Sequence, residues 1–176
     1  MLLEEDLQND LTFTFIYNFI MGMLIIEQLK EKETPPYDLL NMADPSDEAI
    51  KDYLKRGTCY IASTENEAIG VYVLLQTRPF TIELVNVAIA EEYRGLGYGK
   101  KLVAHAIEEA RIRGFHVMEV GTGNASIKQL GLYQKAGFVI NSIDYDFFRK
   151  HYQEPIWEDG IECRHMIRLT MDLNVY

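Results

Sequence analysis

The chain has 176 residues, 48% hydrophobic and 25% charged, which are the proportions of an ordinary globular domain and not of a disordered chain. Its net charge of -10 and pI of about 4.8 disfavour phosphate-rich partners, so neither nucleic acid nor an anionic membrane is expected to bind. Two distant cysteines and four scattered histidines lack metal-ligand spacing, so we expect free thiols in a reducing cytoplasm and no metal site.

Residues 1–22 differ in character from the rest of the chain. The stretch 11–26 carries no charge, but it is shorter than the ~20 apolar residues that cross a bilayer, and the acidic residues before it do not suit a signal peptide. We therefore interpret 1–22 as an appendage to a single domain over 23–176. It is either an extra helix or strand packed on the surface or on a second subunit, or the product of an upstream start codon.

From residue 24 onward, helical and strand patterns alternate. Gly57 and Gly114 are expected to end helices, and 44–48 has the capping, proline and acidic residues of a helix start. The predicted elements are a strand within 24–30, a short helix over 37–42, a helix from this start to about 56, strands over 58–63, 69–76 and 81–89, a helix over 99–113, a strand over 116–121, a helix over 126–136, and strands beginning at 138 and covering 162–173. This order predicts a mixed α/β fold on one central sheet.

A glycine-rich segment, Arg94-Gly95-Leu96-Gly97-Tyr98-Gly99-Lys100, lies between the predicted strand 81–89 and the helix 99–113. Glycines at alternate positions let the backbone approach a ligand closely. The helix start offers unpaired N–H groups and partial positive charge, which suit a pyrophosphate, and Arg94 and Lys100 add cations. Taken alone, the segment indicates an anion site, with a flexible turn that only caps the helix as the alternative.

Two common nucleotide fingerprints do not fit this segment. A P-loop requires G-x-x-x-x-G-K-[ST], whereas Lys101 follows Lys100 here. A Rossmann fingerprint requires G-x-G-x-x-G after a first strand, whereas the spacing here is G-x-G-x-G and several predicted strands precede it. Nucleotide binding is therefore the less favoured interpretation.

The stretch from Arg94 to Gly99 resembles the R/Q-x-x-G-x-G/A motif of the GNAT superfamily of acetyl-CoA-dependent N-acetyltransferases. The preceding 84–93 looks like that family's fourth strand, and 123–127 with 132–138 looks like its second cofactor motif. The resemblance extends over about 23–173. It implies a central, mostly antiparallel, twisted sheet of six to seven strands flanked by about four helices, with a V-shaped splay between strands four and five.

The resemblance also implies where acetyl-CoA binds. The pantetheine arm would fill the splay like an additional strand, bonded to the backbone of Val87 and Ile89, and a backbone N–H near them would hold the oxyanion. Asn124 would bond to the pantetheine or line its approach. The implied cofactor-binding residues are Val87, Ala88, Ile89, Arg94, Gly95, Leu96, Gly97, Tyr98, Gly99, Lys100, Asn124 and Tyr133.

Acetyl transfer to an amine needs proton transfers at both reactants. An alkyl ammonium with a pKa near ~10.4 is neutral only about once in ~10³ at pH 7, so a general base is useful. The family's layout implies Glu83 as the candidate base, with ordered water, or a solvent-facing strand carboxylate without a role, as the alternatives. It also implies Tyr133 as the candidate acid for the leaving thiolate, with a core aromatic as the alternative. Asn86 could bind substrate or water. In a regular strand it faces away from Glu83, but a bulge near residue 86, usual in the family, would change that.

The expected function is transfer of an acetyl group to a primary amine of an unidentified small molecule or peptide. The alternative is a catalytically silent acetyl-CoA-binding sensor or subunit. Three regions would select the acceptor: the 35–56 helices, the 75–80 hairpin and the acidic, aromatic C-terminal segment. The C-terminal segment would bind a cationic amine between its acids and rings, or it is only a solvated acidic loop with core aromatics. The family also implies a homodimer, to which 11–26 would contribute.

Overall fold

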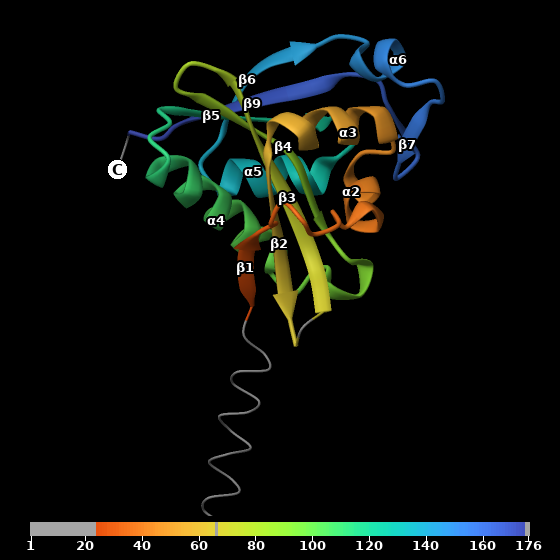
Figure 1. Cartoon of the computed structure of the whole chain (residues 1–176). Helices are drawn as coiled ribbons and strands as arrows, with labels where there is room; N and C mark the ends of the chain where they lie inside the picture. The colour runs from red at the N-terminus through yellow and green to blue at the C-terminus, as the bar shows by residue number, and fades with distance from the viewer. Residues whose placement is uncertain (1–23, 66, 175–176) are drawn as a thin grey trace, which may run out of the picture.

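The computed structural model describes residues 24–65 and 67–174 (Figure 1). Residues 1–22, interpreted above as an appendage, lie outside that range. The elements are β1 (Ile25–Gln28), α2 (Tyr37–Ala43), α3 (Asp47–Arg56), β2 (Thr58–Thr64), β3 (Glu67–Arg78), β4 (Thr81–Ile89), the 3-10 turn η1 (Glu91–Tyr93), α4 (Tyr98–Ile112), β5 (Val117–Gly123), α5 (Ile127–Lys135), β6 (Val139–Asp144), α6 (Phe147–His151), β7 (Ile156–Glu158), β8 (Ile161–Cys163) and β9 (Met166–Asp172).

Seven strands form the central sheet in the order β1-β2-β3-β4-β5-β9-β6. Neighbouring strands are antiparallel except for β4 and β5, which are parallel. The expectation of a mostly antiparallel sheet of six to seven strands is therefore confirmed.

The parallel pair β4–β5 separates after a short contact. Its register joins Thr81–Leu84 to Val117–Val120, whereas β4 continues to Ile89 and β5 continues to Gly123. The second half of β4 is thus paired with β3 on one side and leaves β5 on the other. This is the V-shaped splay that the resemblance implied.

Two apolar layers cover the two faces of the sheet (Figure 1). One face packs against α4 and α5, where the predicted periodic residues Val103, Ala106, Ile107 and Ala110 are all buried. The other face packs against α2 and α3, through Leu40 and Ile50 among others. The helical period of three to four residues thus identified the core face of α4.

The start of α3 follows the predicted capping pattern. The Ser46 hydroxyl accepts a hydrogen bond from the backbone N–H of Ala49 at 3.2 Å, and the Asp44 carboxylate accepts one from the N–H of Ser46 at 3.0 Å. Gly57 follows the helix, but its φ of -101° is not left-handed. Its need for glycine is steric, because a Cβ there would lie 2.8 Å from the carbonyl oxygens of Leu74 and Tyr53.

The region between β6 and β9 differs from the prediction. Instead of one strand over 162–173, β8 pairs with β7 in a separate two-stranded sheet, and β9 begins at Met166. The Asn124 side-chain oxygen accepts hydrogen bonds from the N–H groups of Arg164 and His165, both at 2.7 Å, so the chain turns between the two strands. The helix α6 in this region was also not predicted.

Candidate active site

The glycine-rich turn between β4 and α4 has the backbone of an anion site. Gly95 and Gly97 have φ values of 79° and 85°, a left-handed conformation that other residues adopt at a cost. Gly97 directly precedes α4, and none of the described side chains caps this helix start. A Cβ at either glycine would find no atom within 4 Å, so the space above the turn is open. These features fit a pyrophosphate.

Arg94 closes the turn against the end of β4. Its Nε donates to the backbone oxygen of Ile89 at 3.1 Å, and its guanidinium lies 3.4 Å from the Glu91 carboxylate and 3.9 Å from the sulfur of Met42. Arg94 therefore shapes the turn as well as adding charge. Leu96 is 64% exposed, and Lys100 is an exposed cation in the first turn of α4.

A β-bulge interrupts β4 in the middle of the splay. The register with β3 pairs Asn86 with Val73 but Leu84 with Leu74, which leaves Val85 as the extra residue. Leu84 packs on the α4 side and Val85 on the α2–α3 side, and Asn86 bonds to α2 and α3. The bulge implied by the resemblance is thus confirmed, and it brings Asn86 to the face opposite Leu84, the face of Glu83.

Asn86 joins the bulge to the helices above it. Its amide nitrogen donates to the backbone oxygen of Leu40 at 3.0 Å and to the Tyr53 hydroxyl at 2.8 Å. The side chain is 3% exposed, and its oxygen is buried without a hydrogen-bond partner among the described residues. Only this oxygen is left for the substrate or water that the sequence suggested. The amide nitrogen is structural.

Glu83 lies on the same face and is paired with a cation. The Arg168 guanidinium of β9 donates to the Glu83 carboxylate at 2.9 Å. Burial raises the pKa of Glu83 above its ordinary value, and the charge of Arg168 opposes that rise. Glu83 is therefore not a solvent-facing strand carboxylate. The sequence offered no direct signal for Arg168, 85 residues away.

Tyr133 is 4% exposed on α5, with its ring edge against Phe138 at a centroid distance of 6.0 Å. Burial raises the pKa of its hydroxyl to about 12, and the hydroxyl has no hydrogen-bond partner among the described residues. The phenol therefore keeps its proton at neutral pH and has it available for a ligand.

Asn124, the remaining predicted cofactor ligand, is largely engaged by the chain itself. Besides its two accepted bonds, its side-chain nitrogen donates to the backbone oxygen of Glu162 at 3.0 Å. Contact with pantetheine stays a prediction, and the observed contacts of Asn124 organise the segment before β9.

Two acids of the C-terminal segment are paired with arginines that the composition did not reveal. Glu162 forms two bonds of 2.8 Å with Arg149, and Asp146 is bonded to Arg164. One further contact joins two of the regions expected to select the acceptor, since the hydroxyl of Tyr152, after α6, donates to Asp44, after α2, at 3.1 Å. Asp146 and Glu162 are therefore already paired, and binding of a cationic acceptor by this segment stays a prediction.

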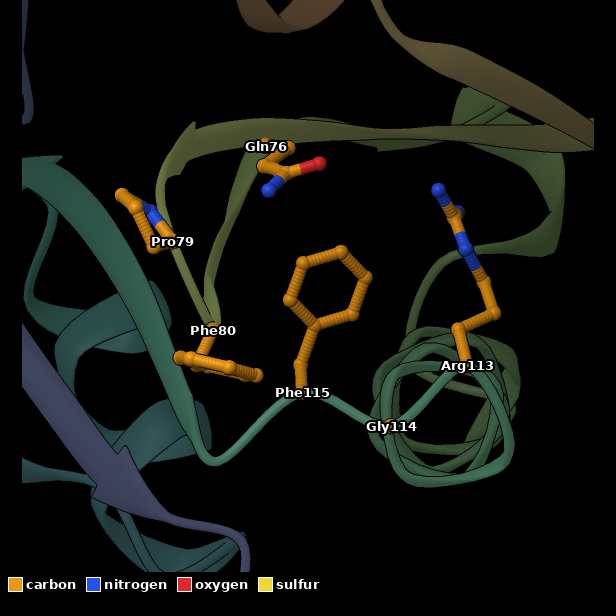
Figure 2. A pocket seen from close by; sticks show the side chains of 6 residues that line it. All are labelled: Gln76, Pro79, Phe80, Arg113, Gly114 and Phe115. Atoms are coloured by element: carbon orange, nitrogen blue, oxygen red, sulfur yellow. The ribbon is translucent and has the colours of Figure 1, made fainter.

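The third expected acceptor region, the hairpin between β3 and β4, borders a separate hollow of about 310 Å³. Figure 2 shows the ring of Phe115 between Phe80 and the Arg113 side chain. The hollow lies at the start of β4, about 25 Å along the strand from the glycine turn at its end. The lining residues are Gln76, Pro79, Phe80, Arg113, Gly114 and Phe115.

Within residues 24–65 and 67–174, no cluster of three or more side chains could hold a metal ion. In the same part of the chain, no helix is long and apolar enough to span a membrane.

Comparisons with known proteins agree with this geometry. A model of the acetyltransferase (GNAT) family matches residues 24–138. The uncharacterized N-acetyltransferase YvbK of Bacillus subtilis is 53% identical over 153 residues, which are 87% of this chain and 99% of YvbK. The crystal structure of a B. subtilis acetyltransferase in complex with CoA has 53% identity and a TM-score of 0.81, with coverage of 85% of this chain and 99% of that one. A GNAT acetyltransferase from Elizabethkingia anophelis with acetyl-CoA bound has 45% identity and a TM-score of 0.83, with coverage of 85% and 97%. The chain belongs to the acetyltransferase (GNAT) family and is an N-acetyltransferase.

Proposed function

We propose that the protein transfers the acetyl group of acetyl-CoA directly to a primary amine of a small molecule or peptide. The splay of β4 from β5, which opens beside the glycine turn, is the observation that carries this proposal. The two relatives crystallised with CoA and acetyl-CoA support the choice of donor.

The donor would be held mainly by backbone. The N–H groups at the start of α4, with Gly95, Gly97 and Gly99 leaving space, would bind the pyrophosphate, aided by Arg94 and Lys100. Val87, Ala88 and Ile89 present the edge of β4 that β5 leaves, and this edge would bond to the pantetheine arm. Leu96 and Tyr98 complete the turn, and Asn124 lies at the end of β5.

The proton transfers would involve two side chains. Glu83, directly or through water, would take a proton from the ammonium so that the nitrogen lone pair can attack the thioester carbon. A backbone N–H near Val87–Ile89 would stabilise the oxyanion. When the tetrahedral intermediate collapses, the carbon–sulfur bond breaks and Tyr133 would give its proton to the sulfur. The second proton of the nitrogen would pass to the Tyr133 oxygen, directly or through water, so that a neutral amide forms and the phenol is restored. The Tyr133 hydroxyl is protonated at neutral pH and has no hydrogen-bond partner among the described residues, so it is available for this transfer.

A panel of amines tests the proposal. Coenzyme A release should be measured with monoamines, amino acids, polyamines and peptide N-termini, and product mass should confirm one added acetyl group. Wild type should turn over at least one acceptor class, and Glu83→Gln should be slower with that acceptor. Stabilisation by acetyl-CoA without turnover of any amine would instead favour a silent binding module, and no stabilisation at all would contradict both.

We also propose that the protein is a cytoplasmic homodimer. The free, buried state of Cys59 and Cys163 supports a reducing compartment. For the dimer, the support within the described residues comes from the edge strand β6, whose Val139, Ile140 and Ile143 are 61%, 51% and 43% exposed. An edge strand with exposed apolar side chains is suited to pairing with a second copy.

A further inference from the structure

A missing side chain on β5 allows Arg168 to reach the candidate base. In the central sheet, β5 lies between β4, which carries Glu83, and β9, which carries Arg168. Gly121 is the residue of β5 paired with Arg168, and a Cβ there would lie 3.4 Å from the Arg168 Nη1. That same nitrogen donates to Glu83 at 2.9 Å. The guanidinium thus crosses β5 over Gly121, where a larger side chain would obstruct it.

Arg168 is also fixed on its other sides. Its guanidinium carbon lies 5.4 Å from the centre of the Phe147 ring, which belongs to α6. Its Nη2 lies 3.9 Å from the Asp144 carboxylate at the end of β6. Arg168 is therefore fixed by contacts from the end of β6 and from α6, and it in turn bonds to Glu83. The sequence did not predict the region between β6 and β9 in detail.

We propose that Arg168 is a positioning residue, which orients the Glu83 carboxylate beside the β4 bulge and keeps it ionised for proton transfer from the acceptor. This inference rests on the proposed function, because it assumes that Glu83 is the base. Arg168 acts through Glu83 and is not itself required to touch the acceptor.

The charges around Glu83 set the direction of the effect. Arg168 from β9 and Arg78 from the end of β3 favour the carboxylate, whereas Glu119 of β5 and burial favour the neutral acid. From the covering helices, the ionisable groups nearby are Tyr53, which is bonded to Asn86, and Asp44, which is bonded to Tyr152. Arg78 is itself paired with Glu119, at 2.5 Å, and therefore does not replace Arg168. Loss of Arg168 would leave Glu83 without its direct partner. The pKa of Glu83 should then rise.

The pH dependence of kcat/KM tests this inference. In Arg168→Gln, the acidic limb should move to higher pH by about one unit, which is a roughly tenfold loss below the limb and a much smaller loss above it. Arg168→Lys keeps the charge and should move the limb less. Arg149→Gln is the control. It removes another arginine–carboxylate ion pair, with Glu162, and should leave the acidic limb unchanged. Equal losses at every pH in Arg168→Gln would overturn the proposal.

Two further measurements separate this inference from the proposed function. A ¹³C-carboxyl NMR titration of Glu83, assigned with Glu83→Gln, needs no activity, and an unchanged midpoint in Arg168→Gln would refute the positioning role. Gly121→Leu should shift the midpoint in the same direction, because atoms beyond its Cβ, which itself lies 3.4 Å from the Arg168 Nη1, would occupy the path of the guanidinium. If the acidic limb of wild type persists in Glu83→Gln, the assignment of Glu83 as base fails, whatever the NMR result.

Discussion

The two proposed binding regions differ in the atoms that a ligand would meet. Around the end of β4 these are mainly backbone atoms, whereas on the sheet face beneath α2 and α3 they are side-chain atoms. The donor region is a turn with two left-handed glycines, an uncapped helix start among the described residues, and a strand edge left open by β5. The proposed acceptor region is a set of paired groups, in which Arg168 bonds to Glu83 and Asn86 bonds to α2 and α3.

This difference explains what each region can vary. A backbone site depends on φ angles and open space, so most substitutions outside its glycines leave it intact. A side-chain site depends on partners from distant segments, so a single replacement removes a contact and leaves its partner unpaired. We expect donor binding and acceptor chemistry to respond to different mutations.

The largest separable effect is expected at Tyr133. In Tyr133→Phe, kcat should fall about 10²- to 10³-fold, because the phenol proton is lost, while the Kd for acetyl-CoA changes little. Tyr60→Phe, which removes a buried hydroxyl bonded to Glu109 at 2.9 Å, is the matched control and should keep kcat. Steady-state kinetics with calorimetric binding measure both quantities. Full activity of Tyr133→Phe would remove this residue from the mechanism.

The next effect concerns donor binding alone. Gly97→Ala places a Cβ at a φ of 85°, which costs about 1–2 kcal/mol and displaces the N–H groups at the start of α4. The Kd for acetyl-CoA should rise about tenfold. Gly114→Ala carries a similar strain, at a φ of 77°, at the other end of the helix and should not change the Kd. Equal affinities of the two variants for acetyl-CoA would place the pyrophosphate elsewhere.

A smaller effect, on folding stability, is expected at the bulge. Asn86→Ala removes one of the two donors to the Leu40 carbonyl, which keeps the N–H of Asp44, and leaves the Tyr53 hydroxyl without its donor; this should cost about 1–2 kcal/mol and lower Tm by about 2–8 °C. Asn141→Ala, at an exposed position of β6, should be neutral. Thermal unfolding followed by circular dichroism makes the comparison. An unchanged Tm in Asn86→Ala would mean that α2 and α3 do not depend on this contact.

The smallest effect on chemistry is expected at the sheet edge, far in sequence from both regions compared above. Ile140→Lys should convert the proposed dimer to a monomer in light scattering at micromolar concentration, with kcat reduced by less than about twofold. Lys128→Glu on α5 is a charge-changing control away from β6 and should remain dimeric. A monomeric wild type would refute the dimer, and a dimeric Ile140→Lys would exclude β6 as its contact.

The geometry of the glycine turn and the open edge of β4 was largely predictable, because glycine spacing and strand order are local properties of the sequence. The splay and the fold followed from the resemblance, and α4 followed from its periodic apolar residues. The acceptor region was less predictable. Glu83 and Arg168 are 85 positions apart in the sequence, and Asp44 and Tyr152 are 108 positions apart. No local sequence pattern predicts partners at such separations. Gly121 was the one available signal, since a glycine inside a strand often marks close approach by another group.

The three hydrogen bonds of the Asn124 side chain hold the chain at Glu162, Arg164 and His165, immediately before β9. They fix the return to the central sheet independently of the length of chain between β6 and this point. The excursion through α6, β7 and β8 is therefore anchored at its exit by one amide, while Phe147 of α6 contacts Arg168 at its entry. An exchange that removes Phe147 should therefore also loosen Arg168, whereas changes confined to β7 should leave both Arg168 and the order of the strands in place.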